Sequence, residues 1–173
     1  KAQFNNNHWA FGDSVYLDWT NASTPIVGSA AFNFRNGSAS IGDSLGLLVY
    51  AGLFNNWAPL DCYIWNKYHQ RIGDSTRVKG GLWYHSSLFI PYPGNDSLIY
   101  LFTLGVTSQY GFYSNTINFK ANNDSGMVLQ KNFLWNNFPA FDALMGVRHG
   151  NGRDWWVISQ RCFPPNFTPS NTF

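Results

Sequence analysis

The stretch "RHGNGRDWWVISQ", residues 148–160, holds the densest group of chemically able side chains in the sequence. A histidine, His149, stands between Arg148 and Arg153, and a pair of tryptophans follows. Such a group could bind an anion or a sugar, with one tryptophan as a stacking platform. Its glycines and asparagine are also typical of a tight turn between two strands. The turn is the favoured interpretation, and Arg148, His149 and Arg153 stay as candidate binding residues.

Two Asn-Asn segments flanked by aromatic residues form a second group, "LFNNWAP" at 53–59 and "LWNNFPA" at 134–140. Asparagine side chains both donate and accept hydrogen bonds, so they suit sugar hydroxyls or a peptide backbone. We expect both segments to be exposed loops that contact a ligand. Their candidate binding residues are Asn55, Asn56, Trp57, Trp135, Asn136 and Asn137.

No catalytic arrangement stands out. Glycoside hydrolysis needs two acids at a defined separation, and the sequence cannot pair the candidates Asp61, Asp142 and Asp154. The motifs of a nucleophile elbow and a phosphate-binding loop are absent. The four histidines lack the spacing of zinc ligands, and the Asx-rich loop at 122–126 lacks the closing acid of a calcium loop. We expect no catalytic residue, no metal and no cofactor.

The composition excludes several classes of protein. Hydrophobic residues make up 45% and aromatic residues 18%, which indicates a globular chain. Charged residues are only 12%, glutamate is absent, and turn-forming and aromatic residues are abundant, which favours an all-β fold. A net charge of +2 gives no reason to expect nucleic acid, and no apolar run is long enough to insert into a membrane. The two cysteines, Cys62 and Cys162, could form one bridge or remain buried thiols.

Short apolar runs between Gly, Asn, Asp and Ser clusters predict strands. The expected strands lie near 14–19, 29–34, 38–42, 46–51, 61–66, 85–90, 98–104, 111–119, 127–134, 142–148 and 154–160. One hairpin recurs three times, as an apolar strand, a Gly-Asx turn and an apolar strand. With an offset of 56, "SLFIP" (87–91) falls on "ALMGV" (143–147), and Ile99 falls on Trp155. A hairpin around Gly42 matches at an offset of 52.

A unit of about 50 residues with about four strands suits a β-propeller blade. We therefore expect a partial propeller of about three four-stranded blades, truncated at the C-terminus, with an irregular β-sandwich as the alternative. The expected segments are N-terminal strands at 1–35, which could close the ring, blades at 36–84 and 85–140, and an incomplete blade at 141–173.

Several motifs, in order along the chain, carry a family resemblance. They are "HWAFGDSVYLDW" (8–19), "GLLVYAG" (46–52), "YIWNKYHQ" (63–70), "SSLFIPYPGNDSLIYLFT" (86–103) and "LMGVRHGNGRDWWVIS" (144–159). This set resembles the N-terminal, WD-repeat-like propeller region of large secreted Bacteroidetes proteins, which often carry a type IX secretion or gliding-associated domain. The chain departs from that pattern at Ala51, where the family usually has an acidic residue. The resemblance implies export to the cell surface or beyond, and it implies no catalytic residue.

We therefore expect an extracellular or cell-surface scaffold that binds a protein or a glycan. Its other partners would be the remaining blades of a longer chain. One alternative is a carbohydrate-active enzyme with acids partly outside this segment. Another is a structural surface protein without a ligand.

Overall fold

The computed structural model describes residues 4–5, 7–20, 23–33, 37–53, 62–74, 77–81, 83–105, 110–163 and 168–170. These residues form an all-β structure of four small antiparallel sheets. The strands are β1 (Phe4–Asn5), β2 (His8–Phe11), β3 (Asp13–Asp18), β4 (Ile26–Asn33), β5 (Ser38–Asp43), β6 (Gly46–Leu53), β7 (Cys62–Asn66), β8 (Ser87–Pro91), β9 (Leu98–Gly105), β10 (Gly111–Asn118), β11 (Met127–Asn136), β12 (Ala140–Arg148), β13 (Trp155–Phe163) and β14 (Thr168–Pro169). All eleven expected strands are present, with shifted bounds, whereas β1, β2 and β14 were not expected.

Each sheet is a meander of strands consecutive in the chain, apart from β1. Sheet I has the order β2-β3-β4, sheet II β1-β5-β6-β7, sheet III β11-β10-β9-β8, and sheet IV β12-β13-β14. The N-terminal strands expected within 1–35 thus divide between two sheets, because β1 pairs with β5. No sheet closes on itself among the described residues.

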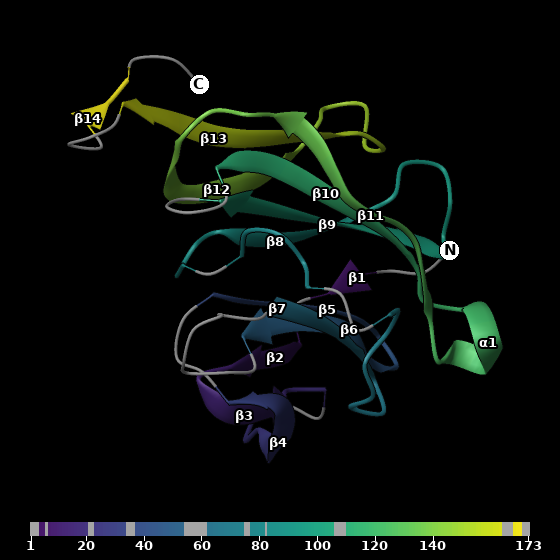
Figure 1. Cartoon of the computed structure of the whole chain (residues 1–173). Helices are drawn as coiled ribbons and strands as arrows, with labels where there is room; N and C mark the ends of the chain where they lie inside the picture. Colours follow the sequence, from purple (N-terminus) through teal and green to yellow (C-terminus); the bar gives the residue numbers. More distant parts are fainter. Residues whose placement is uncertain are drawn as a thin grey trace.

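The four sheets stack in chain order, from sheet I at the bottom of Figure 1 to sheet IV at the top. The first strand of each meander contacts the first strand of the next, so β2 lies beside β5, β5 beside β8, and β8 beside β12. Each inner sheet therefore has two covered faces, and each end sheet has one.

Apolar clusters fill the two lower junctions. Between sheets I and II, Trp65 stacks on Tyr50 with ring centroids 5.5 Å apart, and both rings contact Phe32 of sheet I. The larger cluster between sheets II and III includes Ile64 and Leu101. Burying each large side chain contributes about 1.5–3 kcal/mol. Because sheet II is covered on both faces, all of β7 is buried, and its sequence shows no polar alternation.

Glycines allow the sheets to approach closely at three places. A Cβ added at Gly52 would lie 3.1 Å from the Phe32 ring, across the junction of sheets I and II. At Gly126 it would lie 2.8 Å from Ile72 Cδ1, between sheets II and III. At Gly146 it would lie 3.0 Å from Leu88 Cδ2, between sheets III and IV. An added Cβ at any of these positions would require the side chain that it meets on the neighbouring sheet to shift.

The three hairpins expected from the sequence are β5–β6, β8–β9 and β12–β13, but their turns differ in length. Gly42 lies within β5 and pairs with Leu47, whereas Gly94 lies in the β8–β9 turn, so the match of the Gly42 hairpin at an offset of 52 was wrong before the turn. Residues 93–97 lie inside the pair formed by the Tyr92 N–H and the Leu98 carbonyl, whereas only 150–153 lie inside the corresponding His149–Asp154 pair. The shorter turn shifts the strand before it by one residue. In sheet III Ile90 pairs with Tyr100, and in sheet IV Val147 pairs with Trp156, the residue that corresponds to Tyr100. Val147 is therefore the counterpart of Ile90. The overlay of 87–91 on 143–147 was therefore wrong by one residue, while the match of Ile99 with Trp155 agrees with the pairing.

The segment labelled α1 (Ala121–Asp124) is a tight turn, because Asn122 and Asn123 have left-handed backbone angles. This agrees with a plain turn at 122–126. Both cysteines are free and buried, Cys62 in sheet II and Cys162 in sheet IV. None of the helical residues that the structure describes forms an apolar helix of membrane-spanning length.

Candidate functional site

The turn at 149–154 satisfies most of its own polar groups. The backbone N–H groups of Arg153 and Asp154 both donate to Asn151 Oδ1 at 3.0 Å. The Asn151 amide donates to Asp154 Oδ2 at 2.6 Å, and Arg148 Nε donates to the Gly152 carbonyl at 3.0 Å. These bonds hold the turn that the two sheet-IV strands require.

The charges of this turn also pair within it. Arg153 Nε lies 2.9 Å from Asp154 Oδ1, and this hydrogen bond is the main reason that the pKa of Asp154 falls to about 2. The His149 ring accepts from the Asn151 N–H at 3.2 Å and lies 5.5 Å from the Trp156 ring. Two of the three candidates, Arg148 and Arg153, thus hold the turn rather than an open site.

The second candidate group lies at the other end of β12. Trp135 is exposed near the end of β11 and donates from Nε1 to Ser114 Oγ at 2.9 Å, with Asn136 and Asn137 exposed beside it. The span of β12 from Ala140 to Arg148 lies opposite Trp155–Arg161 of β13, which is six steps of about 3.3 Å, so this group lies roughly 20 Å from the turn at 149–154. Asn55, Asn56 and Trp57 lie outside the described residues. The structure therefore does not join the described candidates into one site.

The candidate acids do not form a hydrolytic pair where they are described. Asp142 accepts a hydrogen bond from the His85 N–H at 2.7 Å, which joins sheets III and IV. The regular part of β12 from Leu144 to Arg148, about 13 Å long, separates it from the turn that carries Asp154. Paired acids of glycosidases lie within about 10 Å. Asp61 lies outside the described residues.

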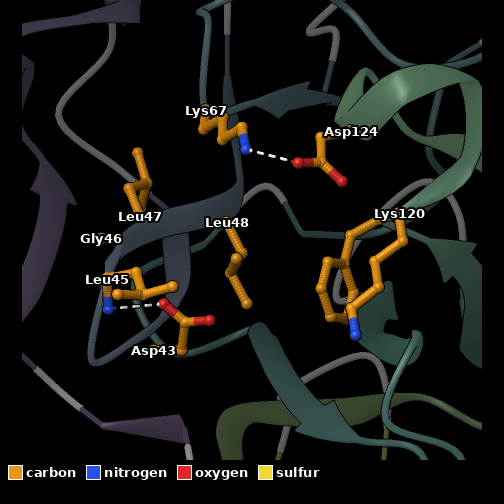
Figure 2. A pocket seen from close by; sticks show the side chains of 9 residues that line it. Asp43, Leu45, Gly46, Leu47, Leu48, Lys67, Lys120 and Asp124 are labelled. Carbon is orange, nitrogen blue, oxygen red and sulfur yellow. Dashed lines mark hydrogen bonds and ion pairs between the residues drawn. The ribbon is translucent and has the colours of Figure 1, made fainter. Parts of the chain in front are cut away.

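A pocket that the sequence did not reveal opens between sheets II and III, at the edge of the stack that carries the α1 turn (Figure 2). Its volume is about 410 Å³. The lining residues are Asp43, Leu45, Gly46, Leu47, Leu48, Lys67, Phe119, Lys120 and Asp124. They come from the β5–β6 turn, the end of β7 and the α1 turn, so only the stacking of the two sheets brings them together.

The pocket combines an apolar base with charges of both signs. Phe119 is buried beneath it, and Leu48 packs against the same core. In one wall Lys67 Nζ lies 2.9 Å from Asp124 Oδ2, and this hydrogen bond raises the pKa of Lys67. Asp43, at the end of β5, and Lys120, which precedes the α1 turn, also line the pocket (Figure 2). A ligand with an apolar group and flanking charges would fit these surroundings.

Among the described residues, no three His, Cys, Asp or Glu side chains gather as a metal site would require. Comparison with protein-family models, with curated proteins and with solved structures finds no match. The fold and the pocket geometry are therefore the basis for a functional proposal.

Proposed function

We propose that this chain is a non-catalytic interaction scaffold, built as an arc of a β-propeller and displayed outside the cell or at its surface. Two observations support the arc. Each sheet is a meander in chain order, and the first strands β2, β5, β8 and β12 adjoin one another in succession. The innermost strands of propeller blades have this relation around a central axis. The proposal of an exported location rests on the family resemblance described above.

The ligand we propose is a peptide segment of a partner protein, bound in the pocket between sheets II and III. The pocket is the observation that carries this proposal. Its apolar base, at Leu48 and Phe119, suits a hydrophobic side chain. Lys120, which precedes the α1 turn, and Asp43, at the end of β5, suit charged or polar groups of the peptide next to that side chain.

Selection from a random-peptide display library tests this function. Peptides selected on the unaltered protein should bind Lys120→Glu at least tenfold more weakly, because the substitution reverses a charge in the pocket. Lys79→Glu makes the same change on an exposed lysine that does not line the pocket, and it should bind like the parent.

A glycan array and a panel of model polysaccharides complete the experiment. Glycan binding that is unaffected by Lys120→Glu, with no selected peptide, would contradict the peptide proposal. Turnover of a polysaccharide that is lost in an Asp→Asn variant would instead support a carbohydrate-active enzyme.

A further inference from the structure

The outer face of sheet IV is apolar, and no other sheet of the described residues covers it. On this face Met145 pairs with Ile158, and Val147 pairs with Trp156. Met145 and Trp156 are each 60% exposed, Val147 is 43% exposed and Ile158 is 40% exposed. Four large apolar side chains, adjacent across two strands, form a continuous patch of the kind that marks interaction sites. We call these four residues the sheet IV face.

The same positions in sheet III are covered. By strand pairing, Tyr100 corresponds to Trp156 and Phe102 to Ile158. Phe102 is buried, and Leu88, its partner across the strand, packs against Gly146 of sheet IV. The face of sheet III that points toward sheet IV is thus covered by sheet IV, whereas the equivalent face of sheet IV is exposed.

The opposite end of the stack has an apolar outer face too. In sheet I, Trp9 pairs with Leu17 and Leu17 pairs with Val27, while Phe11 pairs with Val15. Trp9 is 46% exposed, Phe11 41% and Val27 70%. Strand alternation turns these residues away from the cluster between sheets I and II. We call these five residues the sheet I face.

We propose that two copies of this chain pack head to tail, the sheet IV face of one on the sheet I face of the other, into a closed ring of eight sheets. At every junction within the chain, the face of one sheet that points toward the next sheet in sequence packs on the face of that next sheet that points back. Packing sheet IV of one copy on sheet I of another repeats this arrangement, whereas packing two sheet IV faces together would not. Contacts between unlike faces close when the rotation permits, and eight blades lie within the range of about four to eight found in propellers.

This inference rests on the arc proposed above but not on the peptide site. Size-exclusion chromatography with light scattering tests it, because the chain has a mass of 19.6 kDa and the ring twice that mass. We expect the dimer for the parent protein. Trp156→Asp and Trp9→Asp should each give monomers, since either change spoils both contacts of the ring. Far-UV circular dichroism verifies that each variant is folded.

Mixing the two variants gives the decisive result. Trp9→Asp keeps an intact sheet IV face and Trp156→Asp an intact sheet I face, so the mixture should form a heterodimer joined through one contact. Leu129→Asp replaces an apolar residue of β11, 49% exposed, that belongs to neither face, and it should remain dimeric.

Four results would overturn the proposal. The first two are a monomeric parent protein and a mixture of the two variants that stays monomeric. The third is loss of the dimer in Trp156→Asp but not in Trp9→Asp, which would indicate packing of like faces. The fourth is a species larger than the dimer, which would contradict closure of the ring. Because peptide binding is measured separately with Lys120→Glu, failure of the ring and failure of the pocket are distinguishable.

Discussion

Two glycines with nearly identical φ angles allow the packing of residues 80–81, which follow sheet II, on the end of β9 to be tested by alanine substitution. Gly80 has a φ of +73° and Gly152 a φ of +72°. A Cβ added at Gly80 would lie 2.7 Å from the backbone carbon and oxygen of Leu104, at the point where the neighbouring Gly81 N–H donates to the Leu104 carbonyl. No atom lies within 4 Å of a Cβ added at Gly152. Alanine at Gly80 must therefore displace backbone, and alanine at Gly152 need not.

The expected magnitudes follow from these surroundings. A left-handed backbone costs an L-residue about 1–2 kcal/mol, and the lower entropy of the unfolded alanine variant offsets about 0.4–1 kcal/mol of that. Gly152→Ala should therefore lower the free energy of unfolding by about 1 kcal/mol. Gly80→Ala should lose about 1–3 kcal/mol more, because steric overlap in a packed junction adds that amount.

Urea unfolding followed by tryptophan fluorescence measures both variants. The difference between the two alanine variants isolates the contact with Leu104, because the backbone term is common to both. Equal destabilisation of the two would refute the packing of residues 80–81 on the end of β9.

Three further outcomes follow from the structure. Cys62 and Cys162 are free and buried, so a thiol reagent should react slowly with the native protein. After denaturation without reductant, the reagent should label both cysteines. Labelling of neither cysteine would indicate a disulfide between them. Burial raises the pKa of Tyr50 from 10.0 and of Cys62 from 9.0, each to about 12; the folded state therefore holds these protons more tightly, and stability should fall as the pH rises from about 9 toward 12. Tyr50→Phe should flatten this fall in urea midpoints measured between pH 8 and 11, and an unchanged slope would count against a buried phenol. Asp154→Asn should leave the urea midpoint at pH 7 unchanged, because the ion pair with Arg153 is solvent-exposed.

The strands were predictable because local chemistry determines them. Apolar runs of five to nine residues alternate with Gly-Asx turns. Strands favour the apolar residues, and tight turns favour glycine, asparagine and aspartate. β2 was missed because its four residues, His8–Phe11, follow a run of asparagines and show no periodicity of useful length. The register of the hairpins was out of reach, because a difference of one residue between the turns at 93–97 and 150–153 changes which side chains share a face.

The candidate sites divide in the same way. The turn at 149–154 was recognisable because its glycines and asparagine are adjacent in the sequence. The pocket was not, because Asp43, Lys67 and Lys120 belong to separate segments that meet only when sheet II stacks on sheet III. The exposure of Trp156 was equally hidden, since it depends on the absence of a covering sheet in the described structure rather than on the residue itself.

The order in which the four sheets stack can be measured by nuclear Overhauser effects on the methyl- and aromatic-labelled protein. We expect contacts from the Gly52 Hα to the Phe32 ring, from the Gly126 Hα to the Ile72 methyls, and from the Gly146 Hα to the Leu88 and Ile90 methyls. Each contact crosses one of the three junctions between neighbouring sheets. Absence of these contacts, with contacts between sheets I and III or between sheets II and IV in their place, would contradict the stack.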